Sequence, residues 1–376
     1  MQPLFCTGKQ AESFLLWALF AKLLLHFNDR LIAQAAKGEQ MRHCFGRHAP
    51  AVWALCLALF AAMTAKAGDA YGMEAKRVDG KPFVKWVGGK GQLLEQLLPL
   101  LPEDLAQVEG LTYIEPFVGG GAMLFEMLER FPNIERAVIN DRNSDLMTVY
   151  RVVKECPQAL IARLEIQQAH YYALPDEPAR KAFYLAERER YNTAVLPEVE
   201  RAALFIFLNR TCYNGLYRVN AKGHFNVPFG KAKRPLICDK KTLLADSLLL
   251  QKVTLLSGDF TAVEPFVKAP AFLYFDPPYR PLNASSSFTA YAKGGFDDGE
   301  QVRLAAFCRA LDCREKVRWL LSNSDPHNAD PQDDFFERLY RGFELHRVQA
   351  RRNINSNARK RGAISELVIR NYGATP

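Results

Sequence analysis

The length, composition and charge of the chain limit the classes of protein to which it could belong. Its 376 residues suffice for one large domain or two ordinary ones, and 49% hydrophobic with 24% charged residues is the composition of a globular protein. A net charge of +8 favours an anionic partner such as nucleic acid, although excess charge also serves solubility. The eight cysteines form no C-x-x-C pair, so we expect reduced thiols and no metal site.

The first 72 residues differ from the rest of the chain. Two apolar runs, residues 13–27 and 50–65, are too short for a confident membrane span. The second ends in Ala65-Lys66-Ala67, like a signal peptide, but lies too far from the N-terminus. We therefore expect Met73 to be the native start and residues 1–72 to be a non-native or mis-assigned extension, poorly ordered or helical. A membrane anchor is the alternative, although no stable membrane association is expected.

Two glycine-containing turns open the remainder of the chain. A Gly-Gly-Lys loop ending at Lys90 precedes leucines at helical spacing, with Pro102 as the stop, and its amides could hold an anionic group. Further on, an apolar strand (Leu111–Ile114) ends at Glu115, and three glycines lead into a helix over 122–131. Strand, glycine turn and helix form the first unit of a nucleotide-binding α/β sheet. The turn is not G-x-G-x-x-G, which disfavours a dinucleotide.

Acidic residues stand at the ends of four predicted strands. Asp141 ends the strand after the glycine turn, 26 residues beyond Glu115, close to the offset of an acid that binds ribose hydroxyls. Asp259 and Asp276 follow two later strands, and Asn323 ends another. In an open α/β sheet the ligand crevice lies at these carboxyl ends. An acid without phosphate-binding glycines suits an adenosine ligand that lacks phosphate, such as S-adenosylmethionine.

Residues 150–250 interrupt the alternation of strands and helices. The segment is charged and helical as far as Arg210, and residues 209–235 are then rich in Asn, Gly, aromatic and basic residues. Basic residues interleaved with aromatics are what phosphate neutralisation and base stacking require, whereas a solvated surface loop is the alternative. The aromatic residues concerned are Tyr213, Tyr217, Phe225 and Phe229, and the basic ones are Lys222, Lys231, Lys233 and Arg234.

Taken together, the motifs "KWVGGKG", "EPFVGGGA", "NDRNSDL", "YNGLYRVNAKGHFNVPFG", "GDF", "DPPY", "FTAY" and "RRNINSN" occur in the order of a known family. From about Phe83 to Tyr372 the chain resembles the Dam-type (D12 class, alpha group) DNA adenine-N6 methyltransferases. The resemblance implies an α/β protein with a Rossmann-like methyltransferase sheet. A mainly helical DNA target-recognition domain, residues 151–249, would be inserted between the catalytic segments 73–150 and 250–376.

The resemblance also implies roles for individual residues. The residues expected to bind S-adenosylmethionine are Trp86, Lys90, Glu115, Phe117, Gly119, Gly121, Asp141, Asp259, Phe260 and Asp276. Those expected at the catalytic corner are Asp276, Pro277, Pro278 and Tyr279, with Phe288, Thr289 and Tyr291 closing over the base. Those expected to contact DNA are Lys85, Tyr213, Asn214, Leu216, Arg218, Pro228, Arg351, Arg352, Asn355 and Arg361.

The expected reaction is methyl transfer from S-adenosylmethionine to adenine N6 in duplex DNA, at GATC, with the base flipped out of the helix. The alternatives are another DNA sequence, RNA, or a DNA-binding protein that has lost catalysis. We expect a cytoplasmic, nucleoid-associated monomer. A role beside a restriction endonuclease and a solitary role in replication or mismatch repair both stay open. The segment after Ser322, "NSDPHNADPQDD", is expected to be a surface insertion.

Overall fold

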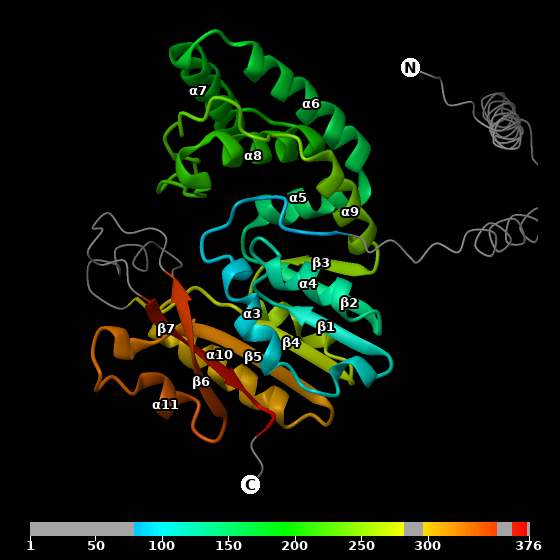
Figure 1. The fold of residues 1–376 in the computed structure, drawn as a ribbon, viewed down its shortest axis with the longest axis vertical. Helices are drawn as coiled ribbons and strands as arrows, with labels where there is room; N and C mark the ends of the chain where they lie inside the picture. Colours follow the sequence, from blue (N-terminus) through cyan, green and yellow to red (C-terminus); the bar gives the residue numbers. More distant parts are fainter. Residues whose placement is uncertain (1–78, 282–295, 352–362, 374–376) are drawn as a thin grey trace, which may run out of the picture. The chain divides into compact units, whose positions relative to one another are not determined.

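The structure, a computed structural model, describes residues 79–281, 296–351 and 363–373 and is built on a seven-stranded sheet (Figure 1). Its strand order is β3-β2-β1-β4-β5-β7-β6, and β7 is antiparallel to both of its neighbours, whereas the other paired strands are parallel. The strands are β1 (Leu111–Glu115), β2 (Ile134–Asp141), β3 (Val253–Ser257), β4 (Ala271–Phe275), β5 (Val317–Ser324), β6 (Glu344–Arg351) and β7 (Ala363–Arg370).

Helices cover both faces of the sheet, as the uniformly apolar central strands require. All five residues of β4 are buried, with Phe272 and Tyr274 in one apolar cluster and Leu273 and Phe275 in the other. The helices on the first face are α4 (Ala122–Arg130), α5 (Ser144–Glu155) and α9 (Lys240–Leu250); those on the second are α10 (Asp298–Asp312) and α11 (Phe335–Leu339). The sheet is therefore doubly wound, as predicted.

The segment before β1 is less regular than its leucine spacing predicts. A short helix, α3 (Leu94–Leu97), is flanked by the 3₁₀ turns η1 (Lys90–Gln92) and η2 (Leu98–Leu100), and η3 (Leu105–Gln107) follows. Pro99 explains the break, because it has no N–H with which to continue the helical ladder.

The helical insertion between β2 and β3 is present. Helices α6 (Pro157–Ala173), α7 (Glu177–Thr193) and α8 (Glu198–Thr211) stand away from the sheet beyond α5 and α9 (Figure 1). The sequence of α8 is apolar on most sides, and the helix is largely buried against α6 and α7. After the 3₁₀ turn η4 (Tyr213–Gly215), an irregular segment leads to α9. The predicted boundary at residue 150 falls inside α5, and that at 250 falls at the end of α9.

The predicted strand ends at Glu115, Asp141 and Asp276 are confirmed, whereas Asp259 lies beyond the end of its strand. Glu115 and Asp141 are the last residues of β1 and β2, Asp276 directly follows β4, and Asp259 follows β3 by two positions. Strands β1 and β4 are neighbours at the point where the strand order reverses, so their carboxyl ends flank the crevice in which ligands bind in doubly wound sheets. No helix within the described ranges is long and apolar enough to cross a membrane.

The expected surface insertion after Ser322 is wrong for its first residues. Asn323, Ser324 and Asp325 are buried, and exposure begins only near Asn328. The reason is that the backbone of Asn323 and Ser324 pairs with β7, while Arg347 on β6 donates to Asp325 at 2.9 Å. These polar residues thus belong to the sheet rather than to a solvated loop.

Candidate active site

A cavity of about 830 Å³ opens at the carboxyl ends of β1, β2 and β4, where Glu115, Asp141 and Asp276 line it. Its wall contains most of the residues that the sequence predicted for cofactor binding and catalysis. Those that line it are Trp86, Lys90, Glu115, Phe117, Gly119, Gly121, Asp141, Asp276, Pro277, Pro278 and Tyr279. Residues from four separate stretches of sequence therefore meet in one site.

The glycine turn forms one side of the cavity and leaves no room for side chains. Gly119 and Gly121 have φ angles of 49° and 77°, in the left-handed region. A Cβ atom at Gly121 would lie 2.5 Å from the Tyr150 hydroxyl, and one at Gly119 would lie 2.8 Å from the Trp86 ring. The N–H of Gly119 donates to Asp141 Oδ2 at 3.0 Å, so the acid predicted for ribose also holds the turn.

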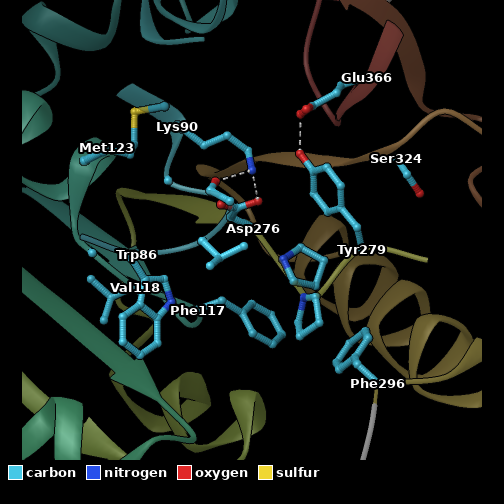
Figure 2. Close-up of a pocket in the computed structure, with 18 of the residues that line it drawn as sticks. Trp86, Lys90, Phe117, Val118, Met123, Asp276, Tyr279, Phe296, Ser324 and Glu366 are labelled. Carbon is cyan, nitrogen blue, oxygen red and sulfur yellow. Dashed lines mark hydrogen bonds and ion pairs between the residues drawn. The ribbon is translucent and has the colours of Figure 1, made fainter. Parts of the chain in front are cut away.

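The catalytic corner begins directly after β4. Asp276 Oδ1 lies 2.7 Å from the Nζ atom of Lys90, and that ammonium group is 4.4 Å from the centroid of the Tyr279 ring. The Tyr279 hydroxyl donates to Glu366 on β7 (Figure 2). Ser322 of β5 also donates to Asp276 Oδ1, at 3.0 Å. Lys90, predicted beside the cofactor, lines the cavity, and its ammonium also contacts the carboxylate predicted for catalysis.

Burial dominates the electrostatics of the carboxyl groups. It raises the pKa of Asp276, while Lys90 and the Ser322 hydrogen bond oppose that rise. The pKa of Glu115 is raised well above its ordinary value, first by burial and then by the charges of Asp276 and Asp141, against the hydrogen bond that Tyr113 donates. Burial also raises the pKa of Asp141. The cavity thus concentrates carboxyl groups that would gain from hydroxyl donors or from a positive ligand.

Two of the residues predicted for the cofactor lie outside the cavity wall. Both oxygens of Asp259 accept from Arg303, at 2.9 and 2.6 Å, and these hydrogen bonds hold the pKa of Asp259 well below its usual range. Phe260 is buried, with ring centroids 5.5 Å from Phe117 and 6.2 Å from Phe296. Since Phe117 and Phe296 line the cavity, Phe260 supports its wall from behind.

The turn predicted to contact DNA is exposed. Tyr213 is 54% exposed, and its N–H donates to the Pro228 carbonyl at 2.8 Å. The next residue, Asn214, adopts a left-handed conformation with φ 55°. Arg218 is also exposed and donates to Asn226 Oδ1 at 2.7 Å. Leu216 is partly buried beside them.

Sequence reasoning missed Asn209, a buried side chain that joins two of the predicted DNA-contacting segments. Its Oδ1 atom accepts from Lys85 N–H at 2.8 Å, and its Nδ2 atom donates to the Lys85 carbonyl at 2.8 Å and to the Gly215 carbonyl at 2.9 Å. This "Asn209 clamp" fixes the opening loop against η4. A lone Asn near the end of an apolar helix gives no local signal of such a role.

The predicted use of the aromatic residues in 209–235 for base stacking is largely wrong. Phe225 and Phe229 are buried, and Tyr217 stacks on Trp86 and Phe205 with centroids 5.6 and 5.3 Å apart. Phe225 packs against Tyr191 and Phe229 against Tyr184, so these two rings belong to the apolar centre of the helical insertion. Of the predicted DNA-contacting residues, Arg351 ends β6, whereas Arg352, Asn355 and Arg361 lie outside the described residues, as do Phe288, Thr289 and Tyr291.

The doubly wound sheet, with a cavity at the point where the strand order reverses, defines a Rossmann-like α/β protein. A match to a family model says more than the fold does. The model of the D12 class N6 adenine-specific DNA methyltransferases matches residues 86–354. The chain belongs to this family, as its motifs predicted.

Curated relatives align over most of this chain. The chain is 48% identical over 295 residues to the type II methyltransferase M.MjaIII of Methanocaldococcus jannaschii, covering 78% of this chain and 99% of the relative. It is 37% identical to the type II methyltransferase M1.LlaDCHI of Lactococcus lactis subsp. cremoris, with coverages of 80% and 99%. Identity to a DNA adenine methylase of Vibrio cholerae is 32%, with coverages of 77% and 95%. The type II methyltransferases and the DNA adenine methylase align with this chain over similar lengths. The narrower Dam-type assignment therefore stays a prediction.

Proposed function

We propose that the protein transfers the methyl group of S-adenosylmethionine to N6 of a flipped adenine in duplex DNA, at the sequence GATC. The observation that carries this proposal is the placement of Asp276, Pro277, Pro278 and Tyr279 on the wall of the cavity that the glycine turn also lines. Membership of the adenine-specific family supports the reaction. The choice of GATC rests on the resemblance of residues 213–230 to the recognition segment of GATC-specific enzymes.

The residues of the cavity fit S-adenosylmethionine. Trp86 and Phe117 offer apolar surface, and the glycine turn lets a ligand approach the backbone closely. Carboxyl groups of Glu115, Asp141 and Asp276 disfavour a phosphate but suit hydroxyl groups and a cationic sulfonium. Bound there, the cofactor would supply a methyl group activated by the positive sulfur.

The catalytic corner is suited to the adenine amine, which is a poor nucleophile because its lone pair is delocalised into the ring. We assign Asp276 and the Pro277 carbonyl to accept its two N–H groups, which would localise the lone pair on nitrogen. The two prolines keep the corner stiff. Tyr279 would stack on the base, a contact that contributes about 1–3 kcal/mol in other proteins. Positioning of the two reactants can lower the barrier by about 7–11 kcal/mol.

We assign DNA recognition to the helical insertion and to Lys85. Extruding a base costs a few kcal/mol, and we assign Tyr213, which is exposed on its turn, to fill the gap in the stack. Asn214, Leu216 and Arg218 are the proposed base contacts, with basic residues of 351–362 on the phosphates. The type II names of two relatives support a place in restriction-modification.

The test is an assay with labelled S-adenosylmethionine on matched duplexes that contain GATC or a scrambled site, with RNA of the same sequence. We expect label only in the GATC duplex, and an Asp276→Ala variant should bind DNA without methylating it. Equal labelling of both duplexes would refute the specificity, and an Asp276→Ala variant as fast as the parent would refute the mechanism. Label in RNA would reassign the substrate.

A further inference from the structure

A chain of buried hydroxyl groups lies behind the catalytic carboxylate. The Tyr274 hydroxyl on β4 is 3.0 Å from Ser322 Oγ on β5, and Ser322 Oγ is 3.0 Å from Asp276 Oδ1. Both Tyr274 and Ser322 are buried, at 1% exposure each. Neither residue was singled out from the sequence, because a Tyr within an apolar strand and a Ser at a strand end are ordinary there.

We propose that Ser322 is a positioning residue for methyl transfer: with Lys90 it holds Asp276 Oδ1, so that Oδ2 is the oxygen presented to the adenine amine. This inference rests on the proposed function. Oδ1 has two donors, Lys90 at 2.7 Å and Ser322 at 3.0 Å. Within the described part of the chain, Oδ2 has no such partner, which leaves it for the substrate.

The direction of the hydrogen bonds in this chain follows from the chemistry of the groups. A carboxylate can only accept, so Ser322 donates its single proton to Asp276. The Tyr274 hydroxyl must then donate to Ser322. Burial raises the pKa of Tyr274 well above its ordinary value, so its proton is retained throughout the working range of pH. The Phe275 carbonyl is the other acceptor near Ser322 Oγ, but at 3.5 Å it is farther away than Asp276 Oδ1 at 3.0 Å, so the order Tyr274 to Ser322 to Asp276 is the favoured arrangement.

The groups that face Asp276 decide what loss of Ser322 would do. Lys90 on η1 favours the ionised carboxylate, whereas burial opposes it. Glu115 on β1 also faces this carboxylate, whose charge raises the pKa of Glu115. On the remaining side stands Tyr279, whose hydroxyl is held by Glu366 on β7. Removing the Ser322 hydroxyl leaves Lys90 as the remaining described donor to Asp276, so the carboxylate should protonate at a higher pH.

The experiment measures kcat and kcat/KM for the duplex as functions of pH. In Ser322→Ala we expect kcat to fall about tenfold and the acid limb of kcat/KM to move up by about one pH unit, because a hydrogen bond to a charged group is lost. Ser322→Thr retains the hydroxyl and should restore the parent profile. Tyr274→Phe, which only frees the Ser322 lone pairs, should move the limb in the same direction by less. Ser247→Ala is the matched control, because it removes a buried serine hydroxyl bonded to the Lys154 carbonyl.

The possible results separate this inference from the function on which it rests. A parent enzyme that methylates no duplex overturns the proposed function and the inference with it. If the parent methylates and Ser322→Ala lowers kcat without moving the acid limb, the positioning role is wrong. The same holds if Ser247→Ala shifts the limb as far as Ser322→Ala does, or if Tyr274→Phe leaves it unmoved.

Discussion

The Lys90–Asp276 ion pair leads to a quantitative prediction. Lys90 is 5% exposed and the Asp276 side chain 20%, and their charged atoms are 2.7 Å apart. In Lys90→Met the Asp276 carboxylate stays partly buried without its cation. Removing one partner of a buried ion pair lowers the free energy of unfolding by about 3–5 kcal/mol. Because Asp276 keeps some exposure, we expect the lower end, about 3 kcal/mol. With a denaturant slope of about 3 kcal/mol/M, the urea midpoint should fall by about 1 M.

The stability lost in Lys90→Met should depend on pH in a definite direction. Burial already raises the pKa of Asp276, so between the unfolded and folded pKa values the native state binds more protons and stability falls as pH rises. Without Lys90 that pKa rises further, so the window extends to higher pH. The deficit of Lys90→Met relative to the parent should therefore be larger at pH 8 than at pH 5.

Urea titrations followed by circular dichroism at both pH values would measure the deficit. The matched control is Lys241→Met, which breaks a pair with Asp79 whose charged atoms are 3.2 Å apart and whose lysine is 78% exposed. Such surface pairs contribute little, so this variant should unfold close to the parent. A Lys90→Met midpoint equal to that of the control, or a deficit that grows toward pH 5, would refute the reasoning.

Three further predictions concern the site and its supports. Gly121→Ala should weaken S-adenosylmethionine binding at least tenfold in calorimetry, because its Cβ would meet the Tyr150 hydroxyl 2.5 Å away at a φ of 77°; unchanged affinity would contradict the role of the turn. Glu366→Ala should lower kcat about tenfold while cofactor affinity is kept, since the Tyr279 hydroxyl loses its acceptor; a parent-like kcat would contradict it. Asn209→Asp should lower stability by about 2 kcal/mol and reduce the preference for GATC over single-mismatch duplexes, because two donated hydrogen bonds are lost. Lower stability with unchanged preference would limit Asn209 to a structural role.

The strands of the sheet and the corner at residues 276–279 could be predicted because each is marked by a short, continuous sequence pattern. Apolar runs that end at Glu115, Asp141 and Asp276 define strands by composition alone, and a glycine turn marks the step from strand to helix. In a doubly wound sheet, strand ends converge without any further information. Most of the residues that line the cavity could therefore be predicted from the sequence.

The supports of the site could not be predicted because their partners are distant in the chain. Asn209 bonds to Lys85 across 124 positions, and Ser322 bonds to Asp276 across 46. No local pattern encodes such a pairing. The same limit explains the error at Phe225 and Phe229, since aromatic residues in an irregular segment do not show whether helices elsewhere in the chain will cover them.

The position of β7 in the sheet has a consequence for how the enzyme is made. Glu366, which fixes the Tyr279 hydroxyl, lies on a strand that pairs with both β5 and β6, and in synthesis it leaves the ribosome after every other strand. Until β7 is inserted, β5 has an unpaired edge and the Tyr279 ring lacks its anchor. A nascent chain would thus carry every residue of the predicted catalytic corner before Tyr279 has its anchor, so the corner is complete only once the last strand of the sheet has been made.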